Sequence, residues 1–282
     1  MPQTPREIRD LLARQNHRPR HRFGQNFMVD GNLVRAVADA GEVVAGDTVV
    51  EVGPGTGTLT GELIERVGVA GKVVAFEIDR DLAALLRREI DAPNFELVEG
   101  DALAGKRALH PRLNELAGGG GGGGGGKLVA NLPYNVASPL VIEMLVVGCP
   151  LLAFTVQLEV AERMKAGPGT KQYGPLSVMA QVMAEVEVLR TLPPGAFWPP
   201  PKITSGLVRL RRRADVPADP AHLSRVVTTL FQRRRKTLRN AAEPLGLSPA
   251  DLEAAGVDPT VRPETLDVPA MLRLAAAVAS AS

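Results

Sequence analysis

The stretch "TVVEVGPGTGTLT", residues 48–60, decides the fold of the first half of the chain. It opens on an apolar, β-branched run typical of a buried strand, continues with glycines at alternate positions, and ends where a helical pattern begins. Glycines in such a turn let backbone N–H groups and a helix N-terminus approach a ligand closely. The stretch therefore predicts a strand, a ligand-binding turn and a helix.

Four further apolar runs alternate with helical segments, as parallel βαβ units do. One predicted helix carries Leu59, Leu63 and Val67 on one face, and the next is expected to begin at a cap formed by Asp79 or Arg80. The strands are expected at "TVVEVG" from Thr48, "KVVAFEID" from Lys72, "FELVEGD" from Phe95, "KLVAN" from Lys127 and "LLAFTVQ" from Leu151.

The length of the chain and its changes of pattern predict two domains and an extension. With 282 residues, 45% of them hydrophobic, the chain can bury one full core and a smaller second one. We expect a basic N-terminal extension over residues 1–22, a Rossmann-like domain over 23–214 whose sheet is closed by its last, basic strand, and a helical domain over 215–282. The glycine run at 118–126 is interpreted as a loop.

The net charge of +2 is small, but the cations are clustered. One run without acids extends from Arg14 to Arg22 and another from Arg233 to Arg239, and such runs suit a polyanionic partner. The single cysteine, Cys149, excludes an internal disulfide and fits a reducing compartment. The sequence shows neither a secretory leader nor an apolar run of about 18 residues, so we expect a soluble cytoplasmic protein without a membrane partner.

Candidate ligand-binding residues follow the first four strands. The turn with Gly53 and Gly55 follows the first strand, Glu77 the second, Asp101 the third and Asn131 the fourth. Because the carboxyl ends of parallel strands share one edge of a sheet, these residues are expected to face one crevice. The alternative for Glu77 and Asp101 is helix capping, since each precedes a turn or a helix.

The glycine spacing separates two kinds of nucleotide ligand. A dinucleotide fingerprint, G-x-G-x-x-G from Gly55, requires a glycine where the chain has Thr60. Glu51 followed by alternate glycines, with Glu77 after the next strand, resembles instead the class I S-adenosylmethionine-dependent methyltransferases. The resemblance implies that Glu77 accepts hydrogen bonds from both ribose hydroxyls of the cofactor and that Asp101 reaches its adenine amino group.

The strand from Lys127 ends on an amide, a proline and an aromatic ring. The exocyclic amine of a base is a poor nucleophile, because its lone pair is delocalised into the ring. The Asn131 side chain and the backbone of Leu132 and Pro133 can accept from such an amine while Tyr134 stacks on a flipped or unpaired base. The alternative is an ordinary turn with Tyr134 in the core. The scattered histidines and lone cysteine predict no metal site.

Longer motifs extend the resemblance from about Arg20 to Ala277. They are "RFGQNFMVD" (22–30), "GPGTKQYGPLSVMAQ" (167–181), "AFWPPPKITSGLVRL" (196–210) and "QRRRKTLRN" (232–240). With them the chain resembles the bacterial small-subunit (16S) ribosomal RNA adenine dimethyltransferases, in the rRNA adenine N-methyltransferase family. The resemblance implies an α/β class I methyltransferase domain, Rossmann-like with a mostly parallel seven-stranded sheet, and a small all-helical C-terminal domain.

The same resemblance implies an activity and a set of site residues. S-adenosyl-L-methionine would supply two methyl groups to each of two adjacent adenines in the 3′-terminal hairpin loop of 16S rRNA, in the immature 30S subunit, through a monomeric enzyme. Asn26 and Met28 would close over the methionine end of the cofactor, and Phe197 would stack on the adenine opposite Tyr134. The cofactor set is Asn26, Met28, Gly53, Gly55, Glu77, Asp101 and Asn131, and the catalytic set is Asn131, Leu132, Pro133, Tyr134 and Phe197.

The basic runs are expected to meet the RNA. The second run is predicted to lie on a helix whose apolar side packs inward, so that its cations face phosphates, and a merely solvated face is the alternative. The first run is either an RNA contact or a disordered tail. The expected RNA-binding residues are Arg22, Lys202, Arg233, Arg234, Arg235, Lys236 and Arg239.

Three other functions stay open at this point. A related methyltransferase acts on large-subunit rRNA and confers macrolide resistance, but "QRRRKTLRN" and the chain length after "PPPK" favour the small-subunit enzymes. An assembly factor would act chiefly by binding the immature subunit, and its catalysis would be secondary. A dinucleotide oxidoreductase would bind NAD, and Thr60 and "NLPY" oppose it.

Overall fold

The computed structural model describes residues 3–14, 19, 25–105, 108–118 and 125–281. They form two compact units, one from Met1–Ala161 with Glu187–Arg212 and the other from Glu162–Val186 with Arg213–Ser282. The second unit therefore resumes at Arg213, next to the boundary at Ala214 drawn from the sequence. It also includes residues 162–186, which the sequence analysis placed in the first domain.

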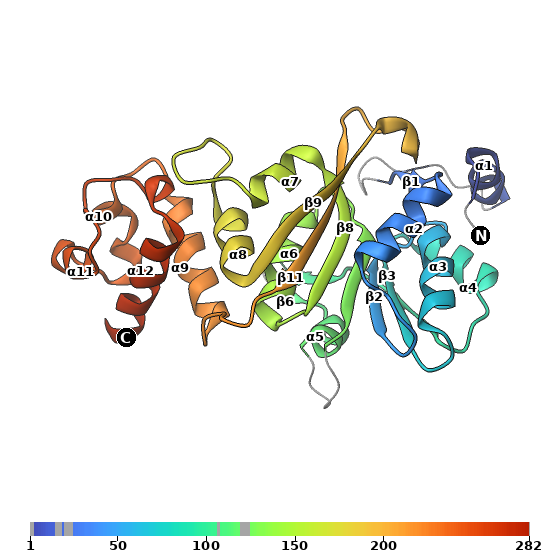
Figure 1. Ribbon diagram of the computed structural model, residues 1–282, viewed down its shortest axis with the longest axis horizontal. Coiled ribbons are helices and arrows are strands. Elements are labelled where there is room, and N and C mark those ends of the chain that lie inside the picture. Colours follow the sequence, from blue (N-terminus) through green and yellow to red (C-terminus); the bar gives the residue numbers. More distant parts are fainter. Residues whose placement is uncertain (1–2, 15–18, 20–24, 106–107, 119–124, 282) are drawn as a thin grey trace. The chain divides into compact units, whose positions relative to one another are not determined.

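The first unit is built on a seven-stranded sheet with the order β4-β3-β2-β7-β8-β11-β9 (Figure 1). The strands from β4 to β8 pair in parallel, and β11 pairs with β8 in antiparallel register. This is the mostly parallel, Rossmann-like sheet that was predicted. The strands are β2 (Thr48–Val52), β3 (Lys72–Glu77), β4 (Phe95–Glu99), β7 (Lys127–Asn131), β8 (Leu151–Gln157), β9 (Ala184–Leu192) and β11 (Ser205–Arg212).

Helices cover both faces of this sheet. The chain passes from β2 to β3 to β4 in one direction along the sheet and from β7 to β8 in the other, and right-handed crossovers in opposite directions put their helices on opposite faces. Burial on both faces explains why the inner strands β2, β3, β7 and β8 are largely apolar. Asp79 caps α4, as expected, by accepting from the backbone N–H of Asp81. The helices are α2 (Gly31–Ala40), α3 (Thr58–Val67), α4 (Arg80–Glu89), α5 (Pro111–Ala117), α6 (Ala137–Val147) and α7 (Leu158–Met164), with a small hairpin of β5 (Leu103–Gly105) and β6 (Ala108–Leu109).

The edge of the sheet differs from the prediction. Strand β9 lies outside β11, so the expectation that the last basic strand closes the sheet is wrong. The sequence of β9, "AEVEVLRTL", lacks a continuous apolar run because Glu185, Arg190 and Thr191 are exposed. Charged side chains of this kind are common on edge strands, where they discourage pairing with other chains, and they hide the strand from a search for apolar runs.

The N-terminal segment is part of the first unit. Helix α1 (Pro5–Arg14) is amphipathic and buries Ile8 and Leu12 in a cluster with Phe27 and Leu82. Phe27 begins β1 (Phe27–Met28), which pairs with β10 (Phe197–Trp198). Residues 5–14 of the predicted basic extension are thus a packed helix.

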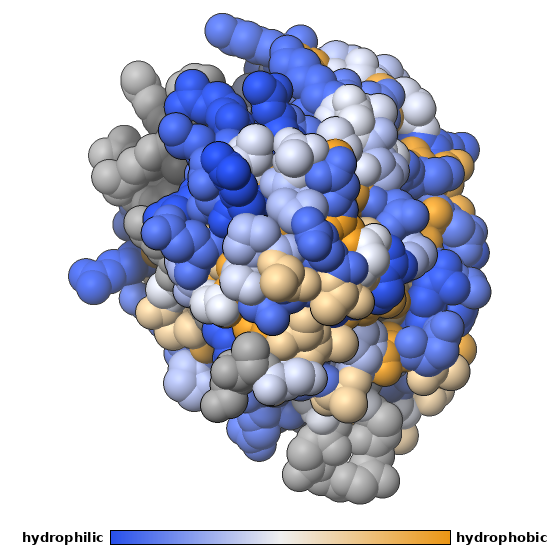
Figure 2. Space-filling view, turned by 90° about the vertical axis from the view of Figure 1, so that its left-hand side faces the viewer, coloured by the Kyte–Doolittle hydropathy of each residue, from blue (hydrophilic) through white to orange (hydrophobic). Residues whose placement is uncertain are grey.

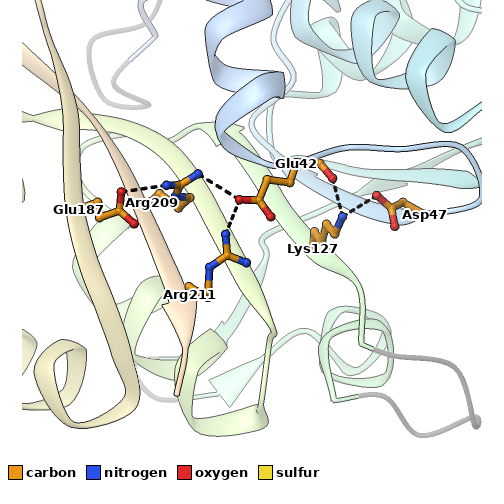
Figure 3. Close-up of polar contacts among 6 residues, drawn as sticks. All are labelled: Glu42, Asp47, Lys127, Glu187, Arg209 and Arg211. Atoms are coloured by element: carbon orange, nitrogen blue, oxygen red, sulfur yellow. Dashed lines mark hydrogen bonds and ion pairs between the residues drawn. The ribbon is translucent and has the colours of Figure 1, made fainter. Parts of the chain in front are cut away.

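A network of ion pairs joins the amino ends of the parallel strands to β11. Lys127, the first residue of β7, donates to the Asp47 carboxylate at 2.7 Å and to the backbone carbonyl of Glu42 at 2.6 Å. The Glu42 carboxylate accepts from Arg209 at 3.0 Å and from Arg211. Its bond with Arg211 is the main cause that lowers the pKa of Glu42. The network consists of Glu42, Asp47, Lys127, Glu187, Arg209 and Arg211 (Figure 3).

The second unit is helical. Residues 162–186 belong to it because Tyr173 is fully buried there, with its hydroxyl donating to the Leu266 carbonyl at 2.9 Å and its ring edge against Phe231. Its helices are α8 (Pro175–Met183), α9 (Pro220–Gln232), α10 (Leu238–Ala241), α11 (Pro249–Ala254) and α12 (Val268–Ala281), with single 3₁₀ turns at Glu243–Leu245 and Pro263–Thr265.

Most of the basic run of the second unit is not on a helix as predicted, and of its five cations only Arg239 lies on one, α10. Helix α9 ends at Gln232, and residues 233–236 form a turn before Thr237, the N-cap of α10. The N–H groups of Leu238 and Arg239 then bond to the carbonyls of Val261 and Pro259 instead of to the preceding turn. Cations at the C-terminal end of α9 complement its dipole, whereas continued helix would crowd like charges three and four residues apart.

Hydrophilic residues dominate the upper part of the face drawn in Figure 2, and weakly hydrophobic ones gather near its centre. Within the described ranges, no helix combines the length and the apolar character needed to cross a membrane.

Candidate active site

The glycine turn after β2 leaves no room for side chains. Gly53 and Gly55 have φ of +73° and +62°, which residues with a Cβ rarely adopt. A Cβ on Gly55 would lie 2.9 Å from the ring of Phe27, and one on Gly53 would lie 3.0 Å from the ring of Pro133. The turn therefore passes closely between two segments that are distant in sequence.

The segment that precedes α1 adds a hydrogen-bonded contact to this turn. The Gln3 side chain donates to the carbonyl of Thr56 and accepts from the hydroxyl of Thr58, each at 3.0 Å. Both threonines line the pocket described below. The residues before the basic run thus contact the glycine turn beside the pocket, a contact that was not predicted.

Glu77, at the end of β3, is held by backbone N–H groups. Its carboxylate accepts from Gly55 at 3.2 Å and from Asp79 at 2.9 Å. The residue is only 4% exposed, and burial raises its pKa to about 7 despite these bonds. Helix capping, the alternative interpretation, is performed by Asp79 instead, so Glu77 is available to the pocket.

Glu51 lies beside it and is buried more deeply. It accepts a hydrogen bond from the Thr60 hydroxyl at 2.7 Å, at the position where a dinucleotide fingerprint would have its third glycine. Burial, and to a smaller extent the charge of Glu77, raises the pKa of Glu51 to about 8, while the Thr60 bond opposes the shift.

Glu51→Gln is expected to flatten the pH dependence of stability. The folded-state pKa of about 8 lies above the ordinary 4.5. As pH rises between these values the unfolded chain releases its proton first, so the free energy of unfolding falls by up to about 1.4 kcal/mol per pH unit. Glutamine keeps an acceptor for Thr60 but cannot ionise. Thermal unfolding from pH 5 to 8 measures the slope, with the exposed Glu115→Gln as control. If the free energy of unfolding of Glu51→Gln and Glu115→Gln changed equally with pH, ionisation of Glu51 would not be the cause of the pH dependence.

Asp101 combines two roles. It follows β4, is exposed, and lines the pocket. One of its carboxylate oxygens also accepts from the backbone N–H of Leu103 at 2.9 Å, which forms the turn into β5. The turn-forming alternative is therefore present together with the placement at the pocket.

Asn131 ends β7, and its amide is held from two sides. The Asn131 Nδ2 donates to the Asn26 carbonyl at 2.7 Å, and Thr155 on β8 donates to its Oδ1. The next residue, Leu132, is buried. Tyr134 is half-buried, with its hydroxyl 2.9 Å from that of Ser205.

One pocket brings the predicted cofactor residues together. It opens at the carboxyl edge of the parallel strands and has a volume of about 870 Å³, its open mouth included. All of the predicted cofactor set line it: Asn26, Met28, Gly53, Gly55, Glu77, Asp101 and Asn131. Pro133 of the catalytic set also lines it. Lining residues that the sequence analysis missed include Gln25, Thr56, Thr58, Ile78 and Asn135, several of them direct neighbours of predicted residues.

Three predicted catalytic residues lie off the wall of this pocket: Leu132, Tyr134 and Phe197. Phe197 is 2% exposed and belongs to the core cluster that includes Met28 and Leu207. The structure thus places its ring inside the first unit, away from a position where a base would stack. The "FWPPPK" motif contains no feature that distinguishes these two placements.

The predicted RNA-binding residues fall in separate places. Lys202 is exposed between β10 and β11 of the first unit. In the second unit Arg235, Lys236 and Arg239 are exposed and Arg234 is half-buried. Arg233 donates to the Asn240 carbonyl at 2.9 Å and pairs with Glu243 at 3.1 Å. Arg22, and most of the first basic run, lies outside the described residues.

The groups of the pocket fit S-adenosylmethionine. The Glu77 and Asp101 carboxylates suit the hydroxyl and amino donors of an adenosine, and Phe76 and Ile78 offer apolar surface between them. Gly55 and Phe27 both line the pocket, and a Cβ on Gly55 would collide with the Phe27 ring. Because glycine has no Cβ, the backbone of the turn can lie at the pocket wall, close to a ligand. Among the described residues, no group of histidine, cysteine and acidic side chains could hold a metal ion.

Sequence relatives match this chain over most of its length. A Pseudomonas aeruginosa protein named ribosomal RNA small subunit methyltransferase A is 42% identical over 266 residues, covering 92% of this chain and 94% of its own. A Methanopyrus kandleri protein named probable ribosomal RNA small subunit methyltransferase A is 41% identical over 237 residues, covering 82% and 78%.

Solved structures support the fold. A dimethyladenosine transferase from Plasmodium falciparum has a TM-score of 0.67 at 22% identity, covering 88% of this chain and 95% of its own. The 23S rRNA methyltransferase ErmE has a TM-score of 0.58 at 27% identity, covering 90% and 100%. The ribosomal RNA adenine dimethylase family matches residues 16–279. The chain therefore belongs to the ribosomal RNA adenine dimethylase family of S-adenosylmethionine-dependent methyltransferases.

Proposed function

We propose that this enzyme dimethylates the exocyclic amines of two adjacent adenines in the 3′-terminal hairpin loop of 16S rRNA, in the immature 30S subunit and as a monomer. The observation that carries the proposal is the single pocket lined by the whole predicted cofactor set, with Asn131 and Pro133 in its wall. A relative named for the small ribosomal subunit is 42% identical to this chain, whereas the 23S rRNA methyltransferase ErmE is 27% identical. This difference supports small-subunit rRNA as the substrate.

In this proposal the cofactor is held at both ends. Glu77 accepts from the ribose hydroxyls, Asp101 from the adenine amine, and the turn at Gly53 and Gly55 brings its backbone close to the remainder of the molecule. Asn26 and Met28 lie over the methionine end. S-adenosylmethionine supplies an electrophilic methyl group bound to a positively charged sulfur.

The target adenine is activated by hydrogen bonds alone. The Asn131 Oδ1 and the backbone carbonyl of Leu132 accept from the two hydrogens of the amine, so that its lone pair is withdrawn from the ring and points at the methyl group. The N–C bond forms as the S–C bond breaks, and the amine proton leaves to solvent. Tyr134 stacks on the base. Phe197 would have to leave its core cluster to stack as well, so the proposal assigns the stacking to Tyr134.

Transfer of labelled methyl groups tests the substrate. Unmethylated small and large ribosomal subunits are incubated separately with the enzyme and labelled S-adenosylmethionine, and primer extension maps the modified bases. We expect label in the small subunit only, at two adjacent adenines. Label in the large subunit would favour the macrolide-resistance alternative, and NAD binding without S-adenosylmethionine binding would favour an oxidoreductase.

The exposed cations of the second unit are proposed to contact phosphates. Removing Arg235, Lys236 and Arg239 together by alanine substitution is expected to weaken binding to the small subunit and to lower the slope of log K against log salt by about 2, since each lost phosphate contact removes about 0.7 to 0.9. Filter binding between low and moderate salt measures the slope.

The matched control removes the same charge from the surface of α4. Its substitutions are Arg80→Ala, Arg87→Ala and Arg88→Ala, all at exposed positions. An equal change of slope in both triple variants would show that Arg235, Lys236 and Arg239 are merely solvated and do not contact phosphates.

A further inference from the structure

One polar side chain interrupts the apolar strand β8. Thr155 stands between Phe154 and Val156 and is 0% exposed. Its register partners are Asn131 on β7 and Leu207 on β11, so it is enclosed by a strand on each side. A buried hydroxyl destabilises the fold unless it forms a hydrogen bond, and valine, of the same shape, would be the ordinary residue at such a position.

The hydroxyl of Thr155 is directed at the amide of Asn131. On the other side of that amide, Nδ2 donates to the Asn26 carbonyl at 2.7 Å. Because a carbonyl oxygen can only accept, the nitrogen must face Asn26 and the oxygen must face Thr155, whose hydroxyl therefore donates. The two bonds fix both the rotation of the amide and the identity of the atom on each side.

The same threonine also holds the residue that follows Asn131. The backbone N–H of Leu132 donates to the Thr155 carbonyl at 3.2 Å. The Asn131 side chain and the Leu132 backbone, which together form the proposed cradle for the adenine amine, are thus both attached to one residue of the neighbouring strand. The backbone bond persists in any substitution, so a change of side chain removes the hydroxyl contact alone.

We propose that Thr155 is a positioning residue for methyl transfer: its hydroxyl holds the Asn131 carbonyl in the orientation that receives the target amine. The inference rests on the proposed function of Asn131. A carboxamide oxygen has two lone pairs, so one is left for the amine while Thr155 uses the other. A β-branched side chain in a central strand has little rotational freedom, which makes the direction of this bond stable. Small displacements of a positioning group lower turnover more than binding.

Thr155→Val removes the hydroxyl at constant shape, and Thr155→Ser restores it. With unmethylated small subunits as substrate, we expect kcat of Thr155→Val to fall by about fivefold to tenfold, because that is what one hydrogen bond of ordinary strength is worth. We expect KM for the subunits and Kd for S-adenosylmethionine to stay within about twofold of wild type. Thr155→Ser should regain most of the lost kcat.

Two controls accompany these variants. Thr228→Val removes a partly buried hydroxyl from α9, where it bonds to the Ser224 carbonyl, and reports the general effect of such a loss on kcat. Thr155→Ala also lacks the hydroxyl, and serves if valine is not tolerated in the strand. Thermal unfolding of each variant shows that it is folded.

The outcomes are distinct. A loss of kcat of about fivefold to tenfold in Thr155→Val or Thr155→Ala with rescue by serine supports the inference. An unchanged kcat, a loss that serine shares, or an equal loss in Thr228→Val overturns it. Wild-type enzyme is assayed in parallel, so failure of wild type to methylate small subunits would refute the proposed function itself, whereas active wild type with indifferent Thr155 variants would refute only the role of Thr155.

Discussion

Asn131→Ala should abolish almost all methyl transfer while the protein still binds its RNA. The substitution removes the side-chain acceptor proposed for the adenine amine, so the lone pair stays delocalised in the ring. Loss of one preorganised hydrogen-bonding group at a reacting centre typically lowers kcat by about 10²–10³. The assay is single-turnover transfer of labelled methyl groups to unmethylated small subunits, with affinity for the subunits measured separately.

Asn114→Ala is the matched control, because Asn114 is exposed on α5 and is not among the pocket residues. It should transfer at the wild-type rate. If Asn131→Ala kept more than about a tenth of wild-type kcat, the loss would be below the range expected for such a group. Asn131 would then be a structural residue at a strand end, and the cradle proposed for the amine would be wrong.

Glu77→Ala should lose S-adenosylmethionine binding by about 100-fold or more. The carboxylate is proposed to accept two hydrogen bonds from the ribose, and a bond to a charged group contributes about 1.5–3 kcal/mol, where about 1.4 kcal/mol equals a factor of ten. Isothermal titration calorimetry measures Kd. Glu99→Ala is the control, since Glu99 is the register partner of Glu77 on β4 but does not line the pocket.

The same carboxylate gives wild type a characteristic pH dependence. Burial raises the pKa of Glu77 to about 7 in the protein without ligand, and the proposed ribose contacts need the ionised form. Affinity should therefore fall as pH drops below about 7, by roughly tenfold for each pH unit, and level off above it. Glu77→Gln should bind weakly at every pH. A wild-type Kd that is constant from pH 5.5 to 8 would show that Glu77 does not contact the ligand as a carboxylate.

Glu77→Ala also separates catalysis from assembly. If the variant binds immature small subunits as wild type does, yet transfers no methyl groups, the two roles are independent. Loss of both properties together would indicate that the cofactor-bound form is the one that recognises the RNA, which the assembly-factor alternative does not predict.

The sheet and the residues that line the pocket were predictable because both depend on local patterns. Strands buried on both faces are continuous apolar runs, and residues at their carboxyl ends must meet at one edge whatever the rest of the fold does. Glu77, Asp101 and Asn131 were found in this way. The half-exposed strand β9 lacks such a run, and it was missed.

The hydrogen-bond partners of the proposed catalytic residues depend on register and packing, which a single sequence does not contain. Asn131 bonds to Thr155 only because β7 and β8 pair as they do, and Tyr134 bonds to Ser205 across more than seventy residues. A threonine within an otherwise apolar strand was nevertheless visible in "LLAFTVQ", and it could have identified Thr155. The end of the helix before residues 233–236 was not predicted. The bond from the Leu238 N–H to the Val261 carbonyl, which accompanies it, joins segments that are distant in the sequence.

The ion-pair network around Glu42 has a practical consequence for protein engineering. Strand β7 begins with Lys127, in the network, and ends with Asn131, in the pocket, and at about 3.3 Å per residue the two lie on the order of 13 Å apart. Libraries directed at heat resistance can therefore vary the surface around the network while every residue of the pocket stays fixed. Variants selected in this way should tolerate longer assays with unchanged substrate preference.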